Sequence, residues 1–144
     1  DIVEKNSHLA QEKHITVEIN IDNFPTFYLG DQKLLDHSFT NIITNAIKYS
    51  RSNSAVKIFG DINENKLFLK VSDSGIGIPK DDLDRIGKKF FRAKNTLSVA
   101  GTGIGLYLTK YFVELHGGSV LIESELNVGT AITAFLPISN QVLL

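Results

Sequence analysis

The chain contains no cysteine and no methionine among its 144 residues. Without cysteine, disulfides, thiol catalysis and zinc sites built on thiolates are excluded, and the composition is compatible with a reducing compartment. Because no methionine is present to initiate translation, we expect a fragment of a longer protein. No apolar run approaches the ~20 residues that cross a bilayer, and we expect no signal peptide. We therefore expect a soluble piece.

Net charge is also nearly absent. The 15 lysine and arginine residues are offset by 16 aspartate and glutamate residues. Such a chain has no basic field for a phosphodiester backbone, so nucleic acid is not an expected partner. A chain of this length can bury roughly two-thirds of the surface that its unfolded form exposes, which suits one domain over residues 1–144.

Hydrophobic periods of 3.6 and 2 alternate along the chain, a pattern typical of a mixed α/β layer. The strongest helix follows Asp31, a candidate N-cap. Before it we expect a weak helix over 1–12 and a half-buried strand over 15–21. After it we expect a hairpin of strands around 56–62 and 67–71, a short acidic helix after Pro79, and a helix over about 104–115 closed by Gly117-Gly118. Two final strands are expected over 119–124 and 130–136, with Gly129 in the turn between them.

On the strongest helix, Asn41, Asn45 and Lys48 are spaced to project toward one side. Magnesium takes phosphate oxygens and few protein oxygens, so the amide of Asn45 is an adequate ligand when a triphosphate supplies the negative charge. Lys48 can then neutralise phosphate, and Tyr49 can lie against a base. The alternative is that an asparagine near a helix end only bonds to the backbone.

Asp73 stands at the end of the predicted hairpin and is followed by Gly75 and Gly77. A carboxylate accepts from an exocyclic amine, which favours adenine, whose amino group donates, over the carbonyl edge of guanine. Residues without Cβ let a planar base approach the backbone closely. The alternative is a solvent-exposed turn rich in aspartate, serine and glycine.

A third motif, Gly101-Thr-Gly-Ile-Gly105, opens a predicted helix. Unpaired N–H groups and the helix dipole there favour an anion, so the motif predicts a phosphate cradle. It is not the dinucleotide fingerprint, which follows a strand, nor the lysine-bearing P-loop. A purely structural glycine turn is the alternative.

Residues 87–100 show no sustained periodicity and combine basic side chains with Phe90 and Phe91. We expect a lid over about 80–102, in which the aromatic pair anchors the segment and Arg92 supplies a cation. In the alternative, the phenylalanines are ordinary core and the cations a solvated face.

Together these motifs resemble the histidine-kinase ATP-binding domain of the wider gyrase, Hsp90, histidine kinase and MutL (GHKL) superfamily, over nearly the whole chain. The matching segments are the N box Asn41–Ser50, the glycine boxes Asp73–Pro79 and Gly101–Leu106, the F box Lys89–Arg92, and the closing helix and hairpin at 113–119 and 123–130. The resemblance implies a Bergerat fold, which is an α/β (α+β) two-layer sandwich with a mixed, mainly antiparallel sheet, helices and an ATP lid.

The resemblance also implies roles for individual residues. Asn45 would bind Mg²⁺, Asp73 would read the adenine amine, and Arg92 would lie near the γ-phosphate of ATP, where a guanidinium offsets the charge of the transferring group. The implied catalytic residues are Asn41, Asn45 and Arg92. The other implied nucleotide contacts are Lys48, Tyr49, Gly75, Gly77, Ile78, Phe90, Phe91, Gly101, Thr102, Gly103, Ile104, Gly105, Leu106 and Thr130.

Hydrolytic members of the superfamily carry a glutamate where this chain has Asn41, and an amide cannot act as that general base. This favours a kinase that retains its γ-phosphate until an imidazole attacks. None of the four histidines precedes an acidic residue, as the family's acceptor does. The acceptor is therefore expected on a separate dimerisation domain. His37 stands where the family commonly has a glutamate or glutamine.

The implied partners are the histidine-bearing dimerisation domain of the parent kinase and a cognate response regulator. The fragment alone is expected to be monomeric and cytoplasmic, and its parent a homodimer and a candidate inner-membrane sensor. Three alternatives stay open: an ATPase or a serine-directed anti-sigma kinase on the same fold, or a degenerate nucleotide-sensing module.

Overall fold

A computed structural model describes residues 7–88 and 105–138. Within these ranges the chain forms helices α2 (Ser7–Glu12), α3 (Gln32–Tyr49) and α4 (Gly105–Leu115), the short 3₁₀ helix η1 (Lys80–Arg85), and strands β1 (Thr16–Asn20), β2 (Ala55–Asn63), β3 (Lys66–Asp73), β4 (Ser119–Glu125) and β5 (Gly129–Pro137).

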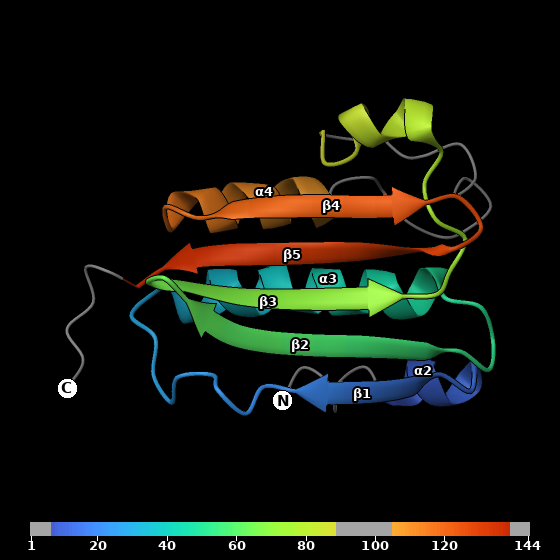
Figure 1. Ribbon diagram of the computed structural model, residues 1–144, viewed down its shortest axis with the longest axis horizontal. Helices are drawn as coiled ribbons and strands as arrows, with labels where there is room; N and C mark the ends of the chain where they lie inside the picture. The colour runs from blue at the N-terminus through green and yellow to red at the C-terminus, as the bar shows by residue number, and fades with distance from the viewer. Residues whose placement is uncertain (1–6, 89–104, 139–144) are drawn as a thin grey trace.

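The strands form one sheet in the order β1-β2-β3-β5-β4 (Figure 1). β1 runs parallel to β2, and the other neighbouring pairs are antiparallel. The sheet is thus mixed and mainly antiparallel, as predicted. Because β3 pairs with β5 across the middle, the end of β3 at Asp73 lies beside the start of β5 at Thr130.

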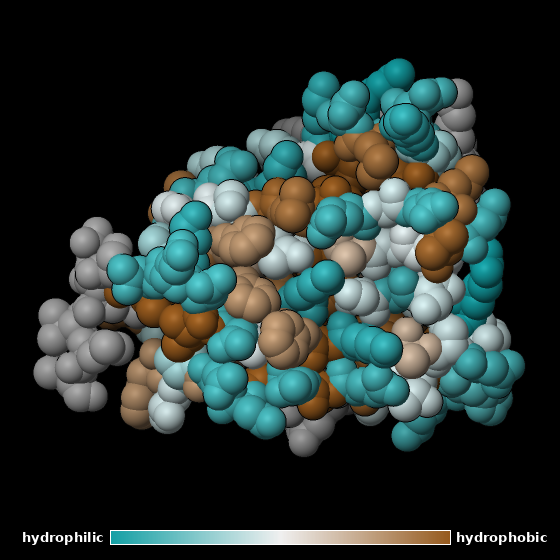
Figure 2. Space-filling view, viewed as in Figure 1, coloured by the Kyte–Doolittle hydropathy of each residue, from teal (hydrophilic) through white to brown (hydrophobic). Residues whose placement is uncertain are grey.

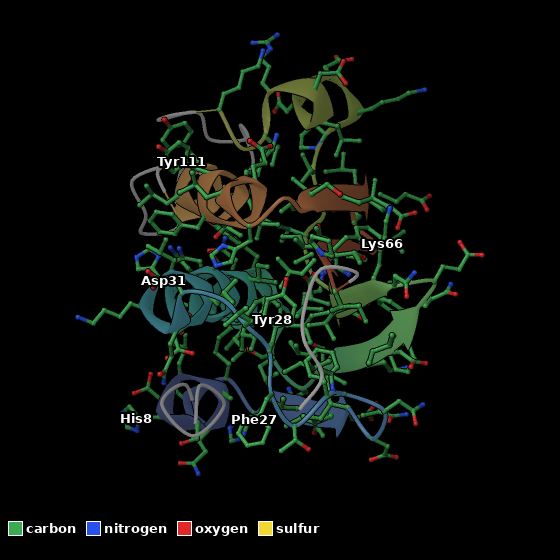
Figure 3. All side chains as sticks on the ribbon, turned by 90° about the vertical axis from the view of Figure 1, so that its left-hand side faces the viewer. His8, Phe27, Tyr28, Asp31, Lys66 and Tyr111 are labelled. Carbon is green, nitrogen blue, oxygen red and sulfur yellow. The ribbon has the colours of Figure 1, made fainter. Side chains whose placement is uncertain are left out.

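Helices α3 and α4 lie side by side against one face of the sheet, so the domain has two layers (Figures 1 and 3). The apolar stripe of α3 and the inward side chains of the central strands make the core. Its most deeply buried members are Ile42, Ile47, Val56, Val71, Val113, Ala134 and Leu136. The two-layer prediction is confirmed.

The N-terminus of α3 is fixed by side-chain caps, which confirms the predicted N-cap. Asp31 Oδ1 accepts a hydrogen bond from the Leu34 amide at 3.1 Å. His116, at the end of α4, accepts from the Asp31 amide through Nε2 at 2.9 Å, and its Nδ1 bonds to the Phe112 carbonyl at 2.8 Å. The imidazole therefore joins the start of α3 to the end of α4, where Gly117 has the left-handed φ of 79° expected of a helix C-cap.

The β2–β3 hairpin places the site carboxylate. Its turn residues Glu64 and Asn65 both have positive φ, 49° and 64°, which matches the right-handed twist of the flanking strands. From this turn the ladder runs without interruption to the pairing of Val56 with Asp73. The predicted position of Asp73 at the end of the hairpin is confirmed.

Some expectations need correction. Strand β1 is more exposed than the predicted half-buried strand because it lies at the edge of the sheet. Ile19 within it is 48% exposed, and Ile21 just beyond its end is 42% exposed. The short acidic helix predicted after Pro79 is present as a 3₁₀ helix with Asp81 and Asp82 in its first turn. Gly129, by contrast, opens β5 instead of lying in the turn. Of the predicted lid over 80–102, residues 89–102 lie outside the described residues.

The sheet face opposite the helices carries a row of aromatic rings. Phe68 lies between Phe59 and Phe135. Its ring centroid is 5.7 Å from that of Phe59 and 6.3 Å from that of Phe135. Figure 2 shows brown and tan groups on this face, interrupted by hydrophilic side chains. No helix in the described ranges combines the length and apolar character that crossing a bilayer requires.

Candidate functional site

The candidate site is built around Asp73, the last residue of β3. Its Oδ1 accepts hydrogen bonds from the Gly75 amide at 2.9 Å and the Thr130 amide at 3.3 Å. Across 7–88 and 105–138, no hydrogen bond to Oδ2 is found. One oxygen therefore fixes the carboxylate, and the other keeps its capacity to accept.

Burial raises the pKa of Asp73, and the Gly75 and Thr130 amides and the nearby Lys13 ammonium act in the opposite direction. Between the ordinary pKa of an aspartate and this raised value, the folded chain binds more protons than the unfolded chain. The free energy of unfolding therefore falls as pH rises through that window. Ionised Asp73 costs stability at neutral pH, as is common for groups kept for function.

The loop after Asp73 has no space for side chains at its two glycines. A Cβ on Gly75 would lie 2.2 Å from the Tyr49 carbonyl oxygen, and one on Gly77 would lie 2.1 Å from the Glu125 carbonyl oxygen. Gly77 also has φ of +69°. These glycines are therefore required by the protein's own backbone, a reason that differs from the predicted approach of a base. That approach stays a prediction.

The β4–β5 hairpin holds the other side of this loop. Ser124 Oγ accepts from the Ile78 amide at 2.9 Å, donates to the Gly129 carbonyl at 2.9 Å and lies 2.8 Å from Thr130 Oγ1. The Asn127 amide donates to the Ile76 carbonyl at 2.8 Å. Ile78 and Thr130 were predicted. Ser124 and Asn127 were not, although the sequence offered a signal in the Asn127–Gly129 turn chemistry.

Helix α3 ends against the same loop. The Ile76 amide donates to the Tyr49 carbonyl at 3.3 Å, so the last turn of α3 and the Asp73 loop are directly bonded. Lys48 Nζ lies 5.5 Å from the centre of the Tyr49 ring. The structure thus brings Tyr49 to the loop that carries Asp73, Gly75 and Gly77.

One turn before Tyr49, Asn45 lies half-buried on α3. No hydrogen bond joins its side-chain amide to any other residue that the structure describes, so the alternative of a backbone-bonded asparagine has no support there. An amide oxygen without a partner among the described residues suits a hard cation such as Mg²⁺. Within the described part of the chain, no group of three or more histidine, cysteine, aspartate or glutamate side chains can hold a metal.

Asn41 is committed to a different partner. Its Nδ2 donates to the Gly105 carbonyl at 3.2 Å and lies 3.1 Å from His37 Nδ1. Thr109 Oγ1 donates to the same Gly105 carbonyl at 3.0 Å. Asn41 therefore joins α3 to the first turn of α4, where the second glycine box ends.

Only the end of that box is described. Gly105 begins α4, and Leu106 packs against the core. The predicted site residues Phe90, Phe91, Arg92, Gly101, Thr102, Gly103 and Ile104 lie outside the described residues. The described candidates therefore form two groups on one helix: Asn41 with Gly105 toward the middle of α3, and Tyr49 with the Asp73 loop at its end.

Comparison with known proteins identifies the family to which the chain belongs. The family described as histidine kinase-, DNA gyrase B-, and HSP90-like ATPase matches residues 30–140. The chain belongs to this family. The ATPase family thus covers most of the described structure, including every described candidate site residue.

Relatives in sequence are sensor kinases. The chain is 34% identical over 137 residues to the sensor histidine kinase WalK of Bacillus subtilis (strain 168), covering 92% of this chain and 22% of WalK. It is 35% identical over 110 residues to the histidine protein kinase DivJ of Caulobacter vibrioides, covering 76% of this chain and 18% of DivJ. The chain therefore spans about a fifth of the length of these relatives.

Solved structures of histidine kinases have the same fold as this chain. A mycobacterial sensor histidine kinase, MprB, superposes with a TM-score of 0.81 at 27% identity, covering 94% of this chain and 92% of that structure. Full-length ShkA in complex with AMPPNP superposes with a TM-score of 0.83 at 23% identity, covering 99% of this chain and 29% of ShkA. The predicted family and fold are confirmed.

We predict that Gly75→Ala lowers the free energy of unfolding by about 1–3 kcal/mol, because overpacking against a backbone carbonyl forces the loop to move. Gly105→Ala is the control, since its Cβ would meet Asn41 at 3.5 Å, an ordinary contact. Urea denaturation of both variants measures the difference. Equal stability of Gly75→Ala and the parent chain would contradict the tight fit.

Proposed function

We propose that this chain is the ATP-binding catalytic domain of a sensor histidine kinase, which positions Mg·ATP for transfer of its γ-phosphoryl group to a histidine on a separate dimerisation domain. The carrying observation is Asp73, which two amides fix through Oδ1, while Oδ2 accepts no hydrogen bond from any residue in 7–88 and 105–138. A carboxylate held in this way suits the exocyclic amine of adenine.

The phosphates would extend from this base site along α3 toward α4. Asn45 would hold Mg²⁺, which neutralises charge on the phosphate oxygens. The absence of any bond from its side-chain amide to the rest of the described structure supports that role. Lys48 would add a cation, and the amides of the second glycine box, Gly101–Gly105, would meet the phosphates. Arg92 would offset charge on the transferring group. The complex of the structural relative ShkA with AMPPNP supports nucleotide binding by this fold.

The chemistry favours transfer to an imidazole over hydrolysis. The Asn41 amide donates to the Gly105 carbonyl and has no basic atom to activate water. In the proposed step, the acceptor nitrogen forms a P–N bond as the bond from phosphorus to the β–γ bridging oxygen breaks, and ADP leaves. The acceptor lies in the parent kinase, with a cognate response regulator downstream. These two partners belong to the proposal.

We predict that Asp73→Asn weakens ATP binding by about 1–3 kcal/mol, roughly 5- to 150-fold, through a lost hydrogen bond to a charged acceptor. The asparagine Oδ1 can keep the Gly75 and Thr130 contacts, and its neutral amide avoids the cost of a buried charge, so folding is retained. Calorimetry with ATP and with purine riboside triphosphate, which lacks the amine, measures the effect. Only ATP binding should weaken; unchanged ATP affinity would remove the base-reading role.

For Asn45→Ala, we predict that the gain in ATP affinity produced by Mg²⁺ is largely lost, while affinity in EDTA stays the same. Titrations in the two buffers measure this difference. Asn20→Ala is a matched amide truncation at the far end of β1, and its magnesium dependence should equal that of the parent chain. Equal affinity of Asn45→Ala and the parent chain in magnesium would exclude Asn45 as the ligand.

Transfer itself can be tested with γ-labelled ATP. We predict no label on this chain alone and acid-labile label on the parent's dimerisation domain when that domain is added. Steady phosphate release from the chain alone would favour an ATPase. Acid-stable label on a partner's serine would favour the anti-sigma kinase alternative, and binding without either reaction would favour a nucleotide-sensing module.

A further inference from the structure

Lys13, in the turn between α2 and β1, lies outside every motif of the sequence. Its ammonium donates to the carbonyls of Ile47 at 2.9 Å, Lys48 at 2.8 Å and Ser50 at 2.5 Å. Its own carbonyl accepts from the Asn53 amide at 3.1 Å. The lysine is therefore bonded to the end of α3 and to the segment that follows it.

These bonds use all the donors that a lysine has. An ammonium carries three N–H groups, and three carbonyls accept from it here. No donor is left for a phosphate, so Lys13 does not serve as a direct ligand of a nucleotide in this arrangement. A cation at a helix C-terminus also complements the helix dipole.

Lys13 does not bond to the Tyr49 carbonyl, which instead contacts the loop that follows Asp73. Tyr49 lies between Lys48 and Ser50, and its carbonyl accepts from Ile76 at 3.3 Å. The Tyr49 carbonyl is also the atom that a Cβ on Gly75 would strike. The last turn of α3 is thus held from one side by Lys13 and from the other by the Asp73 loop.

Charge links the two sides as well. Burial lowers the pKa of Lys13, and the carboxylate of Asp73 acts in the opposite direction. The attraction is mutual, since the Lys13 ammonium favours the ionised form of Asp73. The ammonium therefore offsets part of the effect of burial, which raises the pKa of Asp73.

We propose that Lys13 is a positioning residue for the nucleotide base: it holds the end of α3 against the loop of Asp73 and Gly75, so that the carboxylate stays aimed at the adenine amine. The inference rests on the proposed function. It adds a residue that acts through backbone carbonyls and through charge, without touching the substrate.

The test compares Lys13→Met with Tyr28→Phe in the 144-residue chain. Tyr28→Phe removes another long-range bond from a side chain to a carbonyl, that of Tyr28 Oη to Pro137 at 2.7 Å, at the opposite end of the sheet. Both variants should lose thermal stability. Calorimetry with ATP and with purine riboside triphosphate then separates a positioning role from a structural one.

Lys13→Met should weaken ATP binding roughly 5- to 20-fold, a coupling typical of residues in one bonded network, and should weaken binding of the amine-free analogue less. Tyr28→Phe should leave the ratio of the two affinities unchanged. Lys13→Arg, which keeps charge and several donors, should restore the ratio. In the Asp73→Asn background, Lys13→Met should produce little further loss of the ratio.

The outcomes separate this inference from the proposed function. If Asp73→Asn itself leaves the ratio unchanged, the base-reading function fails. If Asp73→Asn lowers the ratio while Lys13→Met and the milder Lys13→Gln lower only stability, as Tyr28→Phe does, the positioning role of Lys13 is overturned. Lys13→Gln keeps an amide donor and serves for the ratio if Lys13→Met does not fold.

Discussion

The rest of the structure depends on the close packing of one loop, residues 73–79, between the end of α3 and the β4–β5 hairpin. On one side Gly75 lies against the Tyr49 carbonyl, and on the other Gly77 lies against the Glu125 carbonyl, with no space for a Cβ at either position. Segments far apart in the sequence therefore meet at the Asp73 carboxylate. Close-packed backbone at such a point transmits any displacement directly to the side chain that it carries.

This close packing explains why a partly buried carboxylate can stay fixed at a cost to stability. Burial raises the pKa of Asp73, whereas hydrogen bonds from Gly75 and Thr130 and the charge of Lys13 favour its ionised form. Folding alone would be better served by a neutral side chain. An acceptor that costs stability, is fixed through one oxygen and has no partner on the other within the described part of the chain fits a site selected for binding.

Sequence periodicity and turn chemistry predicted the elements, the α3 cap at Asp31 and the position of Asp73, because these depend on residues close in the chain. The order β1-β2-β3-β5-β4 and the parallel edge strand depend on distant pairings that no local pattern encodes. Ser124 and Lys13 were missed for the same reason. Each bonds to backbone atoms of a distant segment. Because every residue type has these backbone atoms, the sequence does not show which residue will be the partner.

Helix α3 is the element that relates the two ends of the proposed nucleotide site. Asn41 meets Gly105 of α4, and Tyr49 meets the Asp73 loop, about 12 Å further along a rigid helix. Asn45 lies between them with its amide unbonded within the described ranges. Because one helix sets this spacing, a shift of its C-terminal turn would move the base-reading end relative to the phosphate end. The three hydrogen bonds from Lys13 to backbone carbonyls hold that turn. A small displacement there has the largest effect on how the base and the phosphates are positioned relative to each other.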